Sequence, residues 1–379
     1  MELINKFNIK EFNNKIFEFL LNHRSSEGFF KLTTNSDFSS FSHCFGIFIL
    51  NSIKRLPEFE DHFVIWSKYI CCEILKDADD LDFRLNKSKM QKLCFGLSAL
   101  HLMNIAPNKE VDNLIFKVID FDIEIYLNDI GFFDNKSQSA NFCMFFGVLL
   151  IYCQEKLKID KSCEISKLIS LQINIVDNNG FFNRNKFSHL AFQNFYHQFE
   201  IFEYLDIQIP NIENGISQIL SLKKSRYFHN APYFGSSGCY DFDALSIVIT
   251  SQDLNLNYLK DFFSYILNQQ NIDFGFSEAK NIRPLHLRYI TNGIRHLLSS
   301  NNFSILKERF MYFINYTHPK YARIDTHWTK YSRRWDESNL WDTWLKIQIL
   351  YKILLVYDYK YHEKINFIEF PGMGYYKFK

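Results

Sequence analysis

Hydrophobic residues recur every three or four positions along most of the chain, a spacing that predicts helices. Strand-like alternation is scarce between these segments. The segments follow one another in pairs whose two members differ. The first member is amphipathic, as in "DNLIFKVIDFDIEIYL", whereas the second is apolar nearly all round, as in "NFCMFFGVLLIYC". This pattern predicts an all-α protein built from helical hairpins.

A short turn motif accompanies the pairs. It reads "EGFF", "IGFF", "NGFF" and "FGFS", with Gly28, Gly131, Gly180 and Gly275 at its centre. These glycines are 103, 49 and 95 residues apart, so the repeating unit is close to fifty residues long. The predicted first members are 3–23, 58–75, 108–127, 160–176, 212–222, 256–269 and 303–316, and the second members are 39–53, 90–103, 140–154, 189–204, 238–251, 284–299 and 339–355.

The difference between the two members favours a closed ring. Inner helices of a ring are buried on every side, whereas an open array of the TPR or HEAT kind leaves similar faces on both layers. We therefore expect an α/α toroid of six to seven hairpins, with inner and outer rings of helices. The chain forms one domain, 1–379, in this interpretation, and 320–379 closes the ring. An open array is the alternative.

Composition narrows the function classes. The 379 residues are 47% hydrophobic and 22% charged, and 43 Lys+Arg against 42 Asp+Glu give a formal net charge of +1. This balance provides no bulk attraction to nucleic acid. The eight cysteines form no CxxC pair, which predicts reduced thiols and a cytoplasmic location. We expect a small-molecule partner; a peripheral membrane contact and the oligomeric state stay open.

The segment "GCYDFDALSIVI" places Asp241 and Asp243 at the head of an apolar helix. An unpaired carboxylate facing a core is unfavourable, so the pair requires water, donors, a cation or a cavity. Capping of the helix N-terminus explains a single aspartate. Two of them at the mouth of a ring, beside Tyr240, indicate a candidate catalytic and substrate-binding site.

A second candidate lies in "THWTKYSRRWDESNLWDTWLKIQIL", which holds four of the five tryptophans together with Arg333 and Asp336. It is either a clasp that seals the ring or a cavity wall. Aromatic faces in such a wall would stabilise a cation or stack on a sugar ring. The residues selected as substrate-binding are Trp335, Asn339, Trp341, Asp342 and Trp344.

Further polar residues recur on presumed inner helices. In "NIRPLHLRYITNGIRHLL", Arg288, Asn292 and Arg295 share one helical face. They either pair with internal carboxylates or bind an anion such as a diphosphate. His197 in "NFYHQFEIF" is a substrate-binding candidate as well, with a core histidine as the alternative.

The hairpins with Gly-Phe turns and the segment "GCYDFDALSIVI" resemble the terpenoid cyclase and protein prenyltransferase superfamily. The resemblance implies an α/α toroid. It places Asp243 at the aspartate that protonates the alkene in squalene-hopene-type cyclases and Asp241 at the first aspartate of their Asp-x-Asp-Asp motif, while Ala244 departs from the last. The prenyltransferase zinc ligands run Asp then Cys, whereas here Cys239 precedes Asp241, so we expect neither metal nor cofactor.

Three functions follow. The favoured one, on the resemblance, is an isomerase- or lyase-type enzyme that cyclises an isoprenoid in a central aromatic cavity, with Asp243 as general acid. The second is a carbohydrate-active α/α barrel that acts on or binds a glycan, with Asp243 and either Asp336 or Asp342 as its carboxylates. The third is a non-catalytic accessory or scaffold toroid.

Overall fold

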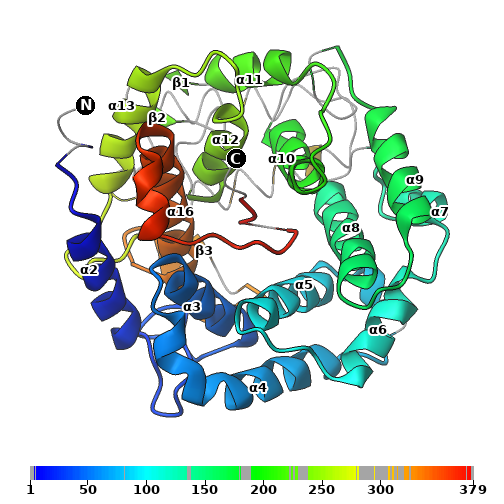
Figure 1. Ribbon diagram of the computed structural model, residues 1–379, viewed down its shortest axis with the longest axis horizontal. Helices are drawn as coiled ribbons and strands as arrows, with labels where there is room; N and C mark the ends of the chain where they lie inside the picture. The colour runs from blue at the N-terminus through cyan, green and yellow to red at the C-terminus, as the bar shows by residue number, and fades with distance from the viewer. Residues whose placement is uncertain are drawn as a thin grey trace. The chain divides into compact units, whose positions relative to one another are not determined.

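The computed structural model describes residues 4, 6–80, 82–134, 138–178, 180, 189–221, 223–224, 227–228, 238–278, 280, 294, 306–307, 310, 314, 320–323, 326–372 and 374–376. These residues are mostly helical and hold only short strands, so the all-α prediction is confirmed (Figure 1). They divide into two compact units. Unit 1 is Met1–Leu56 with Ile219–Asn366, and unit 2 is Pro57–Gln218 with Phe367–Lys379.

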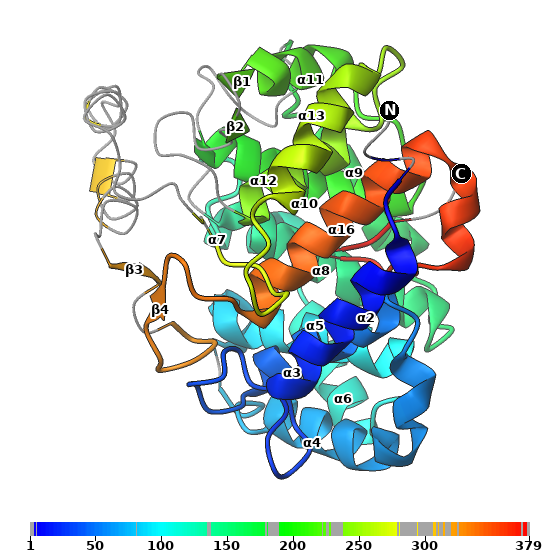
Figure 2. The same ribbon diagram turned by 90° about the vertical axis from the view of Figure 1, so that its left-hand side faces the viewer.

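Among its described residues, unit 1 has three helices, buried almost all round, that lie side by side. The C-terminal helix α16 (Leu340–Tyr357) packs against α12 (Gly238–Val248) on one side and α3 (Ser40–Ser52) on the other (Figures 1 and 2). The described side chains of these three helices are buried almost all round, as their apolar sequences predict. The other elements are the amphipathic helices α2 (Ile9–Asn22) and α13 (Leu256–Leu267), strands β1 (Lys223–Lys224), β2 (Tyr227–Phe228), β3 (Tyr321–Arg323) and β4 (Arg333–Arg334), and the short helix η3 (Tyr359–Glu363).

The helix that pairs with α13 to form a hairpin is α16, as a comparison with the α2–α3 hairpin shows. In the turn after α2, the backbone N–H of Phe30 donates to Nδ1 of His43 on α3 at 3.4 Å. In the turn after α13, the N–H of Phe276 donates to Oγ1 of Thr343 on α16 at 2.9 Å. The α13–α16 hairpin therefore repeats the α2–α3 hairpin. The predicted helices 284–299 and 303–316, apart from a few isolated positions, lie outside the described residues.

In unit 2, α8 (Ser139–Glu155) packs between α5 (Lys87–Leu102) and α10 (His189–Tyr204). The prediction of one helix over 108–127 is wrong, because Asp122 begins a new helix there: its side chain accepts from the N–H groups of the residues two and three positions on. The remaining elements are η1 (Leu56–His62), α4 (Phe63–Leu75), η2 (Phe83–Leu85), α6 (Lys109–Ile119), α7 (Ile123–Asp129), α9 (Ser162–Ile173) and α11 (Ile212–Ser221), which runs into unit 1.

The turn glycines confirm the repeat at three positions and correct it at a fourth. Gly28, Gly131 and Gly180 have φ of 86°, 67° and 78°, a region that favours glycine. In the fourth turn the left-handed residue is Phe274, with φ 70°, and not Gly275. Gly275 is needed for a different reason: a Cβ there would lie 2.2 Å from the ring of Phe19. The motif is therefore displaced by one residue in this copy.

No helix among the described residues combines the length and the apolar character needed to cross a membrane.

Candidate functional site

The N-terminal turns of α16 hold a dense set of buried polar contacts. Asn339 is the N-cap, and its Oδ1 accepts from the N–H of Asp342 at 3.0 Å. The same oxygen accepts from Nη1 of Arg333 at 2.7 Å. Its Nδ2 group donates to Oδ2 of Asp342 at 2.6 Å. Capping therefore fixes the orientation of the Asp342 carboxyl group and brings an arginine to it.

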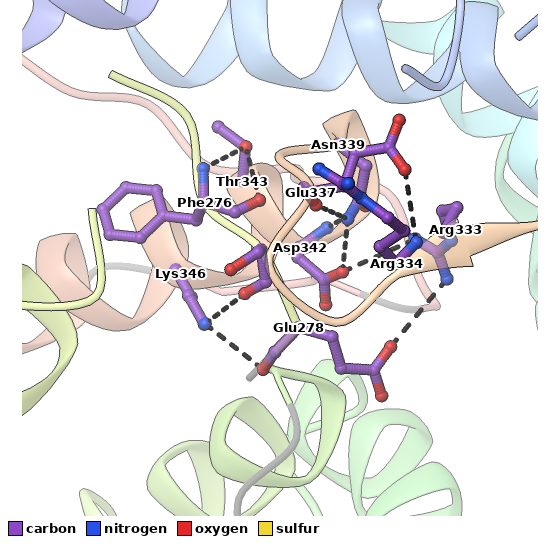
Figure 3. Close-up of polar contacts among 10 residues, drawn as sticks. Phe276, Glu278, Arg333, Arg334, Glu337, Asn339, Asp342, Thr343 and Lys346 are labelled. Carbon is purple, nitrogen blue, oxygen red and sulfur yellow. Dashed lines mark hydrogen bonds and ion pairs between the residues drawn. The ribbon is translucent and has the colours of Figure 1, made fainter. Parts of the chain in front are cut away.

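Arg333 joins two carboxyl groups in this site. It lies on β4 and is 1% exposed. Its Nη1 lies 3.4 Å from Oδ2 of Asp342, and its Nη2 lies 3.9 Å from Oε2 of Glu278 (Figure 3). Glu278 follows the turn after α13 and is 2% exposed. The guanidinium thus partly neutralises carboxylates from two distant parts of the sequence.

Lys346, one helical turn beyond Asp342, is fully buried. Its ammonium donates to Oε1 of Gln269 and to the carbonyl oxygen of Ser277, both at 2.5 Å. A third contact reaches the carbonyl oxygen of Glu278 at 3.4 Å. These three acceptors fix the position of the Lys346 amine and occupy its hydrogen-bond donors.

The start of α12 completes the site. A Cβ on Gly238 would lie 2.7 Å from Oδ1 of Asp342, so glycine is required by this close approach. Asp241, on the first turn of α12, is fully buried, and its charge helps to keep Lys346 protonated. Oδ1 of Asp342 has no hydrogen-bonding partner among the described residues. We refer to Asp241, Glu278, Arg333, Asp342 and Lys346 as the charged cluster.

The charged cluster holds three carboxyl groups and two cations, so it has one negative charge in excess when all are ionised. Burial raises the pKa of Asp342, and the nearby Glu278 raises it further. Arg333, Lys346 and the hydrogen bond from Asn339 oppose that rise without cancelling it. Burial also lowers the pKa of Lys346, against the attraction of the carboxylates. Burial therefore favours the neutral forms of both Asp342 and Lys346, against the attraction between the opposite charges of the cluster.

An aromatic cluster adjoins the charged one. Trp341 lies 4.8 Å from Trp328 and 5.5 Å from Trp344, measured between ring centroids. Phe45 of α3 lies 4.9 Å from Trp341, and Arg333 lies over the ring of Trp328 at 5.6 Å. The guanidinium therefore links the two groups of side chains by a cation–π contact. We use aromatic cluster for Phe45, Phe48, Trp328, Trp341 and Trp344.

The structure brings part of the predicted site together. Asn339 and Asp342 contact Arg333, and the charges of Asp241 and Asp342 both act on Lys346. Two predicted tryptophans, Trp341 and Trp344, belong to the aromatic cluster. The others are placed as follows: Tyr240 and Asp243 are buried on α12, Trp335 is buried directly after β4, His197 lies in unit 2, and Arg288, Asn292 and Arg295 lie outside the described residues.

His197 has its own buried partner on α10. Its Nδ1 lies 3.7 Å from Oε2 of Glu200, whose other oxygen accepts from the hydroxyl of Tyr196 at 2.7 Å and from the N–H of Gly374 at 3.1 Å. Burial lowers the pKa of His197, and Glu200 offsets part of that shift. The arrangement agrees with the alternative of a core histidine.

Sequence reasoning missed Lys346 and Glu278 and did not select Arg333, although it noted that residue. Lys346 had a local signal, because it follows Asp342 by four residues in an otherwise apolar run. Glu278 had none, since only the hairpin brings it to α16.

Among the described residues, no group of three or more His, Cys, Asp or Glu side chains is placed to hold a metal ion.

No family model, curated protein or solved structure matches this chain.

Proposed function

We propose that this chain is an enzyme of the terpenoid cyclase type that protonates an alkene and cyclises it against an aromatic wall. One observation carries the proposal: α16 holds, on adjoining residues, a buried carboxyl group with a raised pKa and two tryptophans of the aromatic cluster, Trp341 and Trp344. Protonation of an alkene requires a neutral carboxylic acid, and the cation it produces is stabilised by π faces.

The toroid that such an enzyme requires is supported by the position of α16. This helix belongs to the last described hairpin, yet it packs directly against α3 of the first hairpin and against α12. A chain whose last and first hairpins are neighbours has the connection that a ring needs. We propose that the six described hairpins, α2–α3 to α13–α16, form an α/α toroid within one domain, closed by 320–379.

Asp342 replaces Asp243 as the proposed acid, and the resemblance implied Asp243. The Asp342 carboxyl proton moves to one alkene carbon, the π electrons form the new C–H bond, and the other carbon becomes cationic. A second double bond of the same substrate closes the ring. Loss of a proton from the cyclic cation then returns a proton to the carboxylate, so acid and substrate atoms balance. Asp241 and Lys346 position the acid electrostatically.

The test is incubation of the purified protein with linear polyprenes and polyprenyl diphosphates in D₂O, followed by mass spectrometry. Cyclisation started by protonation predicts one solvent deuterium in each cyclic product, whereas ionisation of a diphosphate incorporates none at that step. We expect Asp342→Asn to abolish the labelled product and Asp336→Asn, at an exposed carboxylate, to retain it. Loss with Asp243→Asn alone would return the acid role to Asp243.

The two alternatives predict other results. A carbohydrate enzyme would use Asp243 with either Asp336 or Asp342. The first pairing is disfavoured, because Asp243 is buried and Asp336 lies in an open cleft whose lining does not include Asp243. In the second pairing both carboxyl groups are buried. A scaffold toroid predicts no product from any polyprene. It also predicts that Asp342→Asn folds and retains full biological activity.

A further inference from the structure

Unit 1 contains an open polar cleft of about 820 Å³ that the proposed cyclisation does not use. It lies where the turns after α2 and α13 meet the segments around β3 and β4. This size is ample for a drug-sized molecule. We call it the His23 cleft. Its lining consists of His23, Thr34, Asn35, Asn271, Ile272, Asp273, Lys280, Lys320, Tyr321, Tyr331, Ser332, Arg334, Asp336, Glu337 and Ser338.

We propose that the His23 cleft binds a neutral polyhydroxylated small molecule of the sugar class, at a site separate from the charged cluster.

His23 offers a ligand a hydrogen-bond acceptor. It is the C-cap of α2 and only 2% exposed. Its Nδ1 lies 2.8 Å from the carbonyl oxygen of Phe19, so in the neutral ring this nitrogen carries the hydrogen and donates it. Its Nε2 is then an acceptor, and that atom has no hydrogen-bonding partner in the part of the chain that the structure describes. Burial lowers the pKa of His23, which favours the neutral ring. Nε2 is itself buried just behind the cleft wall, so a small shift of the wall at His23 would open this acceptor to a ligand hydroxyl.

The charged side chains that line the His23 cleft are balanced in number. The cleft is lined by three carboxylates, Asp273, Asp336 and Glu337, and by three cations, Lys280, Lys320 and Arg334. The formal charges cancel, so the lining selects neither an anion nor a cation. Asp336 and Arg334 already approach each other at 3.6 Å between Oδ1 and Nε.

The remaining lining is preorganised and mixed in polarity. Ser338 Oγ donates to Oδ1 of Asp273 at 2.8 Å, and Nδ2 of Asn271 donates to Ser338 Oγ at the same distance. These bonds connect the turn after α13 to the approach to α16. Apolar surface is provided by Tyr321, a wall residue, and by Ile272, which is 98% exposed at the rim. A sugar ring has polar edges and an apolar face, and so matches both parts of the lining.

The experiment is calorimetric titration of the full chain with maltotriose and myo-inositol, with glucuronate and glucosamine as charged comparisons. We expect saturable binding of at least one neutral probe and weaker binding of both charged ones. His23→Phe removes the acceptor and is expected to weaken binding about three- to tenfold, which is the value of one hydrogen bond.

Two further measurements keep the test decisive if His23→Phe fails to fold. Ile272→Ser changes a fully exposed residue, so it leaves the fold intact, and it is expected to weaken binding severalfold. The Nε2 resonance of His23 in ¹⁵N NMR is expected to shift on addition of the probe, whereas that of the buried His43 stays fixed. Absence of binding for both neutral probes, or an unshifted His23 resonance in the bound state, would overturn the proposal. Neither result bears on polyprene cyclisation.

Discussion

In the turn after α2, the backbone of Phe30 is held by two side chains of α3, because its N–H donates to Nδ1 of His43 and its carbonyl accepts from Ser42 Oγ at 2.7 Å. In the turn after α13, Thr343 of α16 accepts from the N–H of Phe276. Each turn also contains an isolated antiparallel β-bridge. Arg24 pairs with Phe30, and Gln270 pairs with Phe276, so the two partners are six residues apart in both turns. The two junctions are built in the same way.

The residues that complete the two junctions differ in charge. Counting from the N-caps Ser39 and Asn339, the third position is Ser42 in α3 and Asp342 in α16. The seventh position is Gly46 in α3, where a Cβ would lie 2.2 Å from the Phe30 ring. In α16 that position is Lys346.

The α3 junction shows which residues a hairpin of this kind needs for its structure. On the α3 side, serine, histidine and glycine complete the junction without any carboxylate or ammonium group; the charged residue near it, Arg24, lies in the turn after α2. The hairpin itself therefore does not require Asp342 or Lys346, and buried charges are unfavourable unless they are paired. A chain that places both at one of two equivalent junctions has a local reason for them. Proton donation is the reason that we propose.

The largest expected effect is the response of the α3 junction to acid. Burial lowers the pKa of His43 from the usual 6.5 to about 3. Between these values the unfolded chain binds a proton that the folded chain does not, so the free energy of unfolding falls as the pH falls, by up to ~1.36 kcal/mol per pH unit and about 5 kcal/mol in total. Chemical denaturation at several pH values measures this slope.

His43→Asn keeps an acceptor near the Phe30 N–H but does not titrate, so its slope is expected to be smaller by this amount. Thr343→Ser, at the equivalent position of α16, is the matched control and is expected to leave the slope unchanged. Equal slopes for His43→Asn and the parent protein would show that His43 is not buried in its neutral form.

A second prediction concerns the charges that are present only in α16. Lys346→Met removes the ammonium and leaves carboxylates buried without it, which we expect to destabilise the fold by about 3–5 kcal/mol. The double change Lys346→Met with Asp342→Leu removes the buried carboxyl group together with the amine, and it is expected to be more stable than Lys346→Met alone. A double variant as unstable as the sum of the single changes would mean that the two groups act independently.

Much of the fold could be predicted from the sequence, because amphipathic and fully apolar helices have different patterns. The predicted segment 189–204 coincides with α10, and 39–53 exceeds α3 by one residue at each end. The break between α6 and α7 was missed, since the apolar spacing continues through it and only the cap at Asp122 marks the new start.

The candidate site was predictable only in part. Asp241 and Asp342 were visible as carboxylates at the heads of apolar helices. Lys346 was missed, although its position four residues after Asp342 in an apolar run was a local signal. Glu278 and Arg333 reach the site through the α13–α16 connection and through β4, and no local pattern specifies these long-range contacts.

The smallest expected effect concerns the left-handed position in the turns after α2 and α13. Gly28 holds this position in the first turn, whereas in the second it is held by Phe274, one residue before the glycine. Gly28 has φ 86°, and Gly28→Ala places a side chain in the left-handed region, which we expect to destabilise the protein by ~1–2 kcal/mol. Phe274 is its counterpart at φ 70°, so Phe274→Gly relieves that strain and is expected to change stability by no more than about 1 kcal/mol. Thermal denaturation of both variants measures the difference.

Gly275→Ala distinguishes the two roles of glycine in these turns. Its φ does not require glycine, but its Cβ would overlap the ring of Phe19, so it is destabilising through packing and not through backbone strain. Phe19→Leu replaces the ring with a smaller side chain. It is therefore expected to restore part of the stability lost in Gly275→Ala and none of the stability lost in Gly28→Ala. Equal rescue of both would contradict the displacement, because it would mean that the two glycines hold the same position in their turns.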